Sequence, residues 1–350
     1  MAYTNINDPS AYFQTTLYTG SNNQSITNDG NSDLQPDFVW IKRRSTTEHH
    51  SLTNSSTGVN KQLLSSSNNA EQSRTDQIQS FNTDGFTLGT DGAGYTNVPG
   101  STYVAWQWKA NAGTTSTNND GNHTSVVQAN QDAGFSIVTY TGTGNTSSTV
   151  GHGLGVTPNW IIFKRRDGVG NWDIQIDGTS RATLNLTEAG ATNVLSSFSS
   201  TTFGLGSVTS NEKNANGSPY VAYCFAEKQG YSKFGSYIGN GNGNGPFVHT
   251  GFKPAFVMFK RSTGIQSWDI HDSTRDPFNP MPRRLLPNLT AAEETRPTSG
   301  ISIDCMDFLS NGFKIKSIET ILNASGDTYI YMAFAENPFV TSTGVPTTAR

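Results

Sequence analysis

The sequence predicts an all-β protein made of three tandem antiparallel β-sandwich units of the jelly-roll type, with loops rich in Gly and Asn. One apolar pattern occurs three times along the chain. Charged residues make up 14% and hydrophobic residues 33%, and the latter cluster in short runs, which is typical of short strands between polar turns. The 19 Phe, 12 Tyr and 6 Trp argue against disorder, because aromatic side chains bury a large area each.

The repeated pattern is a proline, then an apolar run, then a basic end that is Lys-Arg in all three copies. Its copies are residues 35–44, 156–166 and 253–262. Proline has no amide hydrogen for a ladder, so it belongs at a strand start. A continuous apolar run without a helix cap predicts a strand buried on both faces. We interpret the Lys-Arg pair as the point where this strand leaves the core.

Other elements recur around this strand in the same order. A strand that ends in Gly precedes each copy. At the same distance after Pro158 and Pro254 come Trp172 and Trp268, which predicts hairpins of equal length. In the first copy, the residue at the same distance after Pro36 is His50 instead of a tryptophan. Each copy then closes with an antiparallel pair of strands, expected at residues 84–89 and 103–108, 202–206 and 220–225, and 311–316 and 329–334.

These repeats define the predicted domain organisation. The parts are a lead-in (1–16), the first unit (17–110), a polar linker (111–134), the second unit (135–228), the third unit (231–338) and a tail (339–350). Units of this size are expected to bury a core each. We expect one strand in the linker, around residues 125–128. The connection between the second and third units is short, so these two are expected to pack tightly and move as one.

Composition also limits the function. A net charge of −4 and a pI of about 5.9 give no basic field, so nucleic-acid binding is not expected. No apolar run reaches membrane length, and the first residues do not resemble a signal peptide. Cys224 and Cys305 are expected to be buried free thiols. The cysteines have no metal-binding spacing, and no cofactor is expected.

Two groups of residues are candidates for chemistry. His152 and His249 both precede the repeated strand, and we expect structural histidines bonded across a turn, with metal binding or catalysis as the alternative. Asp269 and His271 would share one face of a strand and could form an acid–base or metal pair. The second copy has Gln175 in place of His271, which favours a surface pair without chemistry.

Four aromatic residues lie in or near Gly/Asn-rich loops and could contact a glycan. They are Tyr95, Tyr231, Tyr237 and Phe247. An aromatic ring with Asn and Asp neighbours can hold a sugar. The alternative is that these rings pack beneath their own loops, because aromatic side chains favour burial.

Four phrases carry a family resemblance: residues 8–14, 134–144, 151–155 and 220–227. Together they resemble a family of virion structural proteins of marine tailed bacteriophages such as cyanophages, over nearly the whole chain. The resemblance implies a component of the phage particle, often a tail or fibre protein, that is made in the host cytoplasm. It supplies no catalytic residues. The first unit lacks the Trp-Asp phrase, and we expect it to be a divergent copy specialised for attachment.

The expected function is therefore that of a non-enzymatic tail or tail-fibre protein in particle assembly and host-surface attachment. Expected partners are other virion proteins and further copies of this chain (a trimer in a fibre), with a host-surface glycan as a further candidate. A head-decoration or adaptor role is the alternative within the particle. A glycan-degrading depolymerase would need two carboxylates at glycosidase spacing, and no such pair stands out. A free bacterial adhesin would need a signal peptide.

Overall fold

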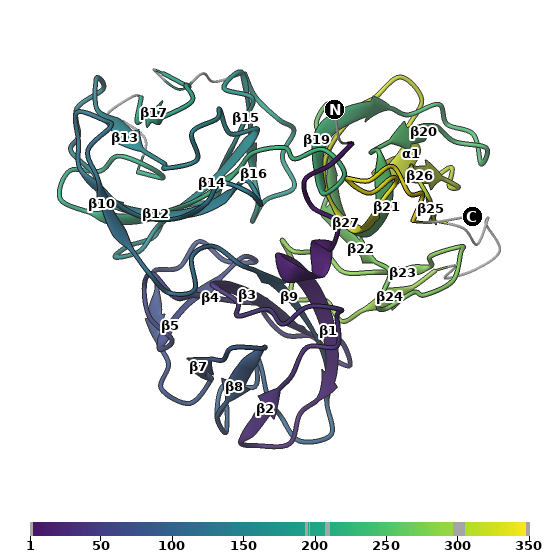
Figure 1. Ribbon diagram of the computed structural model, residues 1–350, viewed down its shortest axis with the longest axis horizontal. Coiled ribbons are helices and arrows are strands. Elements are labelled where there is room, and N and C mark those ends of the chain that lie inside the picture. Colours follow the sequence, from purple (N-terminus) through teal and green to yellow (C-terminus); the bar gives the residue numbers. More distant parts are fainter. Residues whose placement is uncertain (1–2, 193–194, 196, 207–210, 297–304, 348–350) are drawn as a thin grey trace.

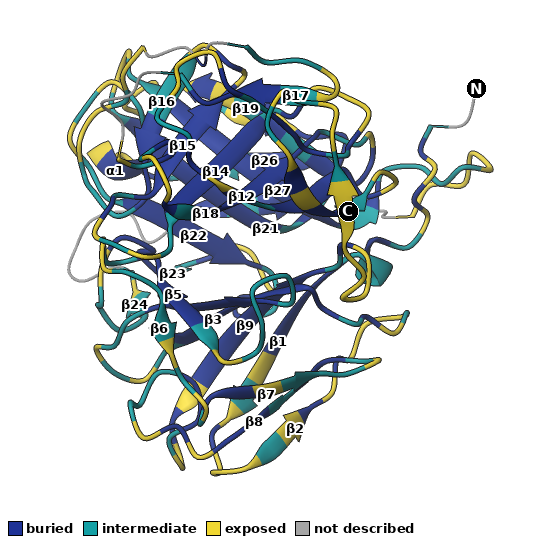
Figure 2. Ribbon diagram, turned by 90° about the vertical axis from the view of Figure 1, so that its left-hand side faces the viewer, coloured by how far each residue is buried: buried dark blue, intermediate teal, exposed yellow. Residues whose placement is uncertain are grey.

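The computed structural model describes residues 3–192, 195, 197–206, 211–296 and 305–347. Three main antiparallel sheets surround a common centre (Figure 1). Strands of the main sheets are largely buried, and exposed residues concentrate in the loops around them (Figure 2). The helical segments are η1 (Pro9–Ala11) and α1 (Thr320–Asn323). In the described part of the chain, no helix has the length and apolar character that crossing a membrane requires. The all-β prediction is confirmed.

The three main sheets share one strand order. The first contains, in order, β1 (Phe13–Thr19), β9 (Thr102–Trp108), β3 (Phe38–Arg43), β4 (Ser51–Asn54), β5 (Lys61–Leu64) and β6 (Gln72–Ser73). The second contains β10 (Ser116–Asn118), β11 (Ser125–Asn130), β12 (Phe135–Thr141), β18 (Pro219–Phe225), β14 (Trp160–Arg165), β15 (Asp173–Ile176) and β16 (Ser180–Thr183). The third contains β19 (Ser232–Ile238), β27 (Thr328–Pro338), β21 (Phe252–Arg261) and β22 (Trp268–Asp272). In each, the last strand of the predicted unit pairs with both the first strand and the Lys-Arg strand.

Smaller sheets cover the outer faces of the main sheets. They are β2 (Gln24–Ile26), β8 (Phe86–Leu88) and β7 (Ile78–Phe81); β13 (Thr149–Gly151) and β17 (Thr202–Gly204); and β20 (Phe247–His249), β26 (Gly312–Ile315) and β25 (Met306–Leu309). The pair of β23 (Arg283–Arg284) and β24 (Glu294–Thr295) instead lies at the edge of the third sheet, where Leu285 bridges Ile270 of β22. Phe86, Phe203 and Phe313 each lie in a local core beneath one main sheet. Each main sheet thus forms a sandwich-like layer pair with its small sheet.

The repeated apolar strands are buried on both faces, as predicted. In β14, Ile161 and Phe163 point into the local core, and Trp160 and Ile162 point toward the common centre. Side chains alternate between the two faces of a strand, so a strand between two cores needs apolar residues at every position. The strands β3 and β21 divide their residues in the same way.

The inward faces of all three main sheets meet in one aromatic core. Trp108, Phe225 and Phe334 occupy matching strand positions and form a triangle, with ring centroids 6.4, 5.7 and 6.0 Å apart. Each unit has a local core of its own, as expected, but the largest core is shared by all three. The second and third sheets pack against each other, as expected, with the rings of Trp160 and Trp268 5.9 Å apart, and the first sheet packs against the same centre.

The polar linker belongs to the second sheet. Its predicted strand is confirmed as β11, which pairs with β12, and β10 is a second strand that the sequence did not indicate. The side-chain amide of Gln128 donates to the hydroxyls of Ser55 and Ser56 in the first unit, at 2.9 and 2.8 Å. The linker therefore extends one sheet and ties it to its neighbour.

The lysine of each Lys-Arg pair lies at a junction between sheets. Lys42, Lys164 and Lys260 are buried, with at most 1% exposure, and the arginines that follow them are half-buried. The prediction that the strand leaves the core at the Lys-Arg pair therefore holds for the arginine and is wrong for the lysine. Each ammonium group donates to a backbone carbonyl of the neighbouring segment: Lys42 to Thr290 at 3.3 Å, Lys164 to Asn68 at 3.2 Å, and Lys260 to Thr187 at 3.3 Å. Lys42 thus joins the first sheet to the third unit, Lys164 joins the second sheet to the first unit, and Lys260 joins the third sheet to the second unit. Together the three junctions close a ring.

Side chains beyond the lysines reinforce two of these junctions. Arg44 pairs with Glu293 at 2.8 Å, and Arg166 pairs with Glu71 at 2.8 Å. At the third junction Ser262 replaces the arginine, and its carbonyl accepts from the backbone of Gly190 at 2.7 Å.

The predicted Trp hairpins also reach across junctions. Trp172 Nε1 donates to the carbonyl of Leu64, and Trp268 Nε1 donates to the carbonyl of Thr183, both at 2.9 Å. His50 takes this place in the first sheet and is held by Trp40, whose Nε1 donates to His50 Nδ1 at 2.9 Å.

Candidate binding site where the three sheets meet

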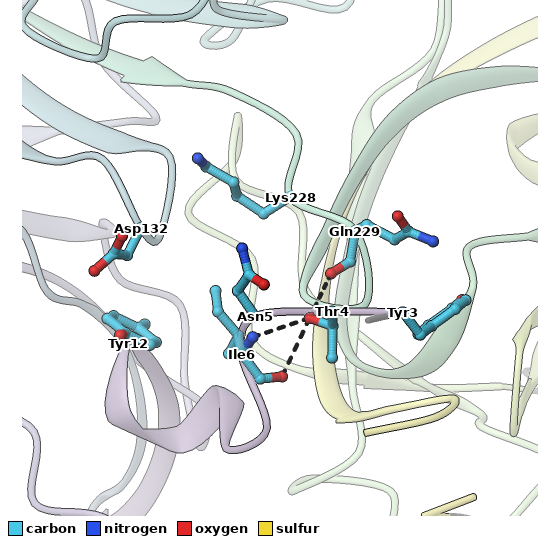
Figure 3. A pocket seen from close by; sticks show the side chains of 8 residues that line it. All are labelled: Tyr3, Thr4, Asn5, Ile6, Tyr12, Asp132, Lys228 and Gln229. Carbon is cyan, nitrogen blue, oxygen red and sulfur yellow. Dashed lines mark hydrogen bonds between the residues drawn. The ribbon is translucent and has the colours of Figure 1, made fainter. Parts of the chain in front are cut away.

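A cavity of about 440 Å³ opens where the N-terminal segment meets the two connections between the main sheets (Figure 3). Its volume lies within the range of about 300 to 1,000 Å³ that is typical of small-molecule sites. The lining residues are Tyr3, Thr4, Asn5, Ile6, Tyr12, Asp132, Lys228 and Gln229.

The N-terminal segment is fixed along one wall by three hydrogen bonds. Thr4 Oγ1 donates to the carbonyl of Gln229 at 2.7 Å and accepts from the amide of Ile6 at 3.0 Å. The hydroxyl of Tyr3 donates to the carbonyl of Gly251 at 2.6 Å. The segment therefore crosses from the first sheet to the third, and it holds Asn5 at the cavity with its side chain exposed.

The floor of the cavity rests on the common core. The ring of Tyr12 meets Tyr231 edge-on with centroids 5.9 Å apart, and Tyr231 meets Phe334 at 5.8 Å. Burial and the charge of Asp132 raise the pKa of the Tyr12 phenol. The hydroxyl is therefore protonated at neutral pH and can both donate and accept a hydrogen bond.

Two opposite charges face this cavity without pairing. Asp132 is exposed and comes from the first connection, whereas Lys228 is half-buried and comes from the second. Among the described residues neither side chain has an ion-pair partner, although the neighbouring Lys233 and Glu227 pair at 2.6 Å. Figure 3 shows the ammonium and the carboxylate on the same side of the cavity. The arrangement can therefore bind a polar ligand through both charges, amide groups and a tyrosine ring.

The match to known families covers nearly all of this arrangement. A family model described as "Domain of unknown function (DUF7483)" matches residues 8–338. The chain belongs to this family. The matched range holds all three main sheets and the cavity residues Tyr12, Asp132, Lys228 and Gln229. No curated protein and no solved structure matches the chain.

The DUF7483 fold does not bring the four predicted glycan-contact residues together. Tyr231 and Tyr237 are 1% and 7% exposed, and Tyr237 stacks on Tyr329 with centroids 4.9 Å apart. These two rings pack inside the protein, which is the alternative interpretation, and they present no face to a sugar. Tyr95 is half-buried against His49 and Phe247 is 45% exposed, so glycan contact at these two residues stays a prediction.

The two candidate histidines differ in position and role. His152 is buried, its Nδ1 accepts from the amide of Leu154 at 3.2 Å, and its Nε2 lies 3.2 Å from the carbonyl of Ser199. The structural role is therefore confirmed for His152. His249 is exposed and pairs with Gly312 on the neighbouring strand β26. In the corresponding strand pair of the second unit, the position of His249 is occupied by Gly151, and His152 comes one residue later. The predicted equivalence of the two histidines is wrong.

Asp269 and His271 form a buried pair. Both side chains are fully buried, with His271 Nε2 3.3 Å from Asp269 Oδ1. Arg284 lies 3.4 Å from the other carboxylate oxygen, and the His271 ring stacks on Phe259. The prediction of a surface pair is wrong because the far edge of β22 is also covered, by a bridge from Ile270 to Leu285. In the described ranges, no group of three or more His, Cys, Asp or Glu could hold a metal ion.

Both cysteines are free and buried, as predicted. Burial raises the pKa of the Cys224 thiol, and it raises that of Cys305 to about 12. Both therefore stay protonated at neutral pH and behave as small apolar side chains.

The residues that matter most at the cavity were not found from the sequence. Asp132 and Lys228 are surface residues of two separate connections and belong to no motif. Only the closed arrangement of the sheets brings them to one place. The one available signal was position, because Asp132 lies near the end of the predicted linker and Lys228 is the last residue of the second predicted unit.

Proposed function

We propose that this DUF7483 chain is a non-enzymatic structural protein of a tailed-phage particle. It is built of three tandem β-sandwich units of the jelly-roll type and serves in the tail or tail fibre, in assembly and host-surface attachment. The observation that carries the proposal is the use of the buried charges. Those at the ends of the Lys-Arg strands join one sheet to the next instead of converging on a cavity, as Lys164 and Arg166 illustrate.

The junction between the first and third sheets shows this use in most detail. Arg275 is fully buried and donates to Asp272 at 2.5 Å and to Glu293 at 3.1 Å. Glu293 also accepts two bonds from Arg44. Bidentate pairs of this kind fix geometry as well as adding energy. A ring held in one arrangement suits a particle component that must keep its shape, and the resemblance to virion proteins supports a place in the particle.

The place of the protein is tested on purified particles. We expect its peptides in the tail fraction when heads and tails are separated and analysed by mass spectrometry. Recovery in the head fraction would support the decoration or adaptor role instead, and absence from particles would overturn the proposal.

The non-enzymatic assignment is tested with host-envelope polysaccharide. We expect the purified protein to release no reducing sugar. Hydrolysis that is lost in Asp132→Asn but kept in Asp33→Asn, a matched exposed carboxylate outside the cavity, would show a depolymerase.

A further inference from the structure

We propose that the cavity at the meeting point of the sheets binds an acidic sugar, such as a uronic acid residue of a polysaccharide. The ammonium of Lys228 would hold the sugar carboxylate, Asp132 and Asn5 would bind its hydroxyl groups, and the ring of Tyr12 would pack against its apolar face. The inference rests on the proposed attachment function and names the class of surface that the protein would recognise.

The charges of the cavity select this ligand class. A lone ammonium group favours an anion, and a hydrogen bond between two charged groups is about twice as strong as a neutral one. Within the described residues Lys228 has no acidic partner, and the nearby Glu227 is taken by Lys233 at 2.6 Å. The positive charge is therefore available to a ligand.

The second charge restricts the ligand further. A carboxylate only accepts hydrogen bonds, and Asp132 faces the same cavity from another connection. A simple dianion would be repelled by Asp132. A sugar acid carries one carboxylate together with several hydroxyl donors, so it can satisfy both residues at once.

The remaining lining suits the body of a sugar ring. Tyr12 is half-buried and supported from below by Tyr231, so its ring is held in place without closing the cavity. The side-chain amides of Asn5 and Gln229 are exposed at the cavity. Each amide can donate and accept, as sugar hydroxyls require.

The test compares two monosaccharide glycosides that differ only at C6. Isothermal titration of the full chain would use methyl β-D-mannopyranosiduronic acid, which carries one carboxylate, and the neutral methyl β-D-mannopyranoside. We expect the acidic probe to bind about tenfold more tightly, which corresponds to one additional charge-assisted hydrogen bond. Its affinity should fall with added salt, whereas that of the neutral probe should not.

Three variants assign the effect to the cavity. Lys228→Gln should reduce the affinity for the acidic probe to that for the neutral probe, and Asp132→Asn should weaken the binding of both probes by about tenfold. The control Lys61→Gln removes a surface lysine whose ammonium bonds only to Ser73 and should change neither affinity. Thermal melts check that each variant is folded.

The outcomes separate this inference from the proposed function. Equal affinity for the two probes, or binding of neither, would overturn the acidic-sugar site and leave the place in the particle intact. Absence of the chain from particles, with selective binding retained, would overturn the particle role alone.

Discussion

At the scale of single residues, the three junction lysines make stability depend on pH. Burial lowers the pKa of Lys42, Lys164 and Lys260 from 10.5 to about 8. Between about pH 8 and 10.5 the unfolded chain keeps protons that the folded chain releases, so the free energy of unfolding rises with pH. Each lysine can contribute a slope of up to about 1.4 kcal/mol per pH unit.

Urea unfolding from pH 7 to 8.5 measures this slope. Higher pH is avoided because burial raises the pKa of the Cys224 and Cys305 thiols and of tyrosines such as Tyr140, and the contribution of those groups falls as the pH rises further. Lys164→Met should flatten the rise, and Lys61→Met, at a surface site, should leave it unchanged. A free energy that stays constant or falls in this window would contradict the lysine assignment.

The strands between two cores give a second residue-scale prediction. Ile162 faces the common core and Val257 a local core, with 5% and 0% exposure. Ile162→Asp and Val257→Asp should each lower the free energy of unfolding by several kcal/mol, because a buried carboxylate would lack a partner. The control Val169→Asp changes a side chain that is 63% exposed and should melt like the parent protein.

At the scale of elements, the indole nitrogen of each Trp hairpin donates across a junction to the backbone of the neighbouring unit. Trp268→Phe removes the donor to the carbonyl of Thr183 and should cost about 1 to 3 kcal/mol beyond the change in volume. Trp108→Phe is the matched control, because Nε1 of this buried tryptophan has no hydrogen-bond partner among the described residues. Equal losses in the two variants would show that packing, rather than the bond, determines the effect.

For most elements, the positions of the strands could be predicted from the sequence, whereas the contacts that surround the strands could not. The apolar run of β14 and the paired Phe and Tyr strands followed from local pattern alone. The predicted strand start at proline is right for Pro36 and Pro158, which precede β3 and β14, but Pro254 lies inside β21 at a register irregularity. A bulge tolerates a residue without an amide donor, and local pattern does not reveal it.

Contacts between distant segments could not be predicted in this way. A lysine at the end of an apolar run normally indicates that the strand end faces solvent. Lys164 is buried instead, because the neighbouring unit covers it and supplies a carbonyl acceptor for its ammonium group. The same reason applies to the site. Tyr237 looked accessible because its loop is rich in Gly, and it is buried because Leu322, far along the chain, accepts its hydroxyl hydrogen at 2.9 Å.

At the scale of the whole molecule, the shared core predicts one cooperative unfolding event. Three sheets that meet through Trp108, Phe225 and Phe334 cannot lose one member without exposing the others. Differential scanning calorimetry should show a single transition with equal calorimetric and van't Hoff enthalpies. Separate transitions for the predicted units would contradict this coupling.

The homo-oligomer, a trimer in a fibre, stays a prediction at this scale. One argument for an oligomer was that small β-sandwich units have limited cores and would need further burial between chains. The common aromatic core already provides that burial within one chain. Light scattering on the full chain decides the matter. A strict monomer that stays soluble at high concentration argues against a fibre shaft and favours a part that relies on the particle for its contacts.

The closed ring has one further consequence, for the effect of mutations. In a symmetric trimer every substitution appears at three interfaces at once. Here each junction is encoded separately, so two carry an Arg–Glu pair, whereas the third has Ser262 and Gly190 in those places and keeps the backbone bond between them that the other junctions also have. One junction can change its chemistry while the other two keep the ring closed. For the same reason a single chain can place one Asp132 opposite one Lys228, whereas a symmetric trimer would carry three copies of each.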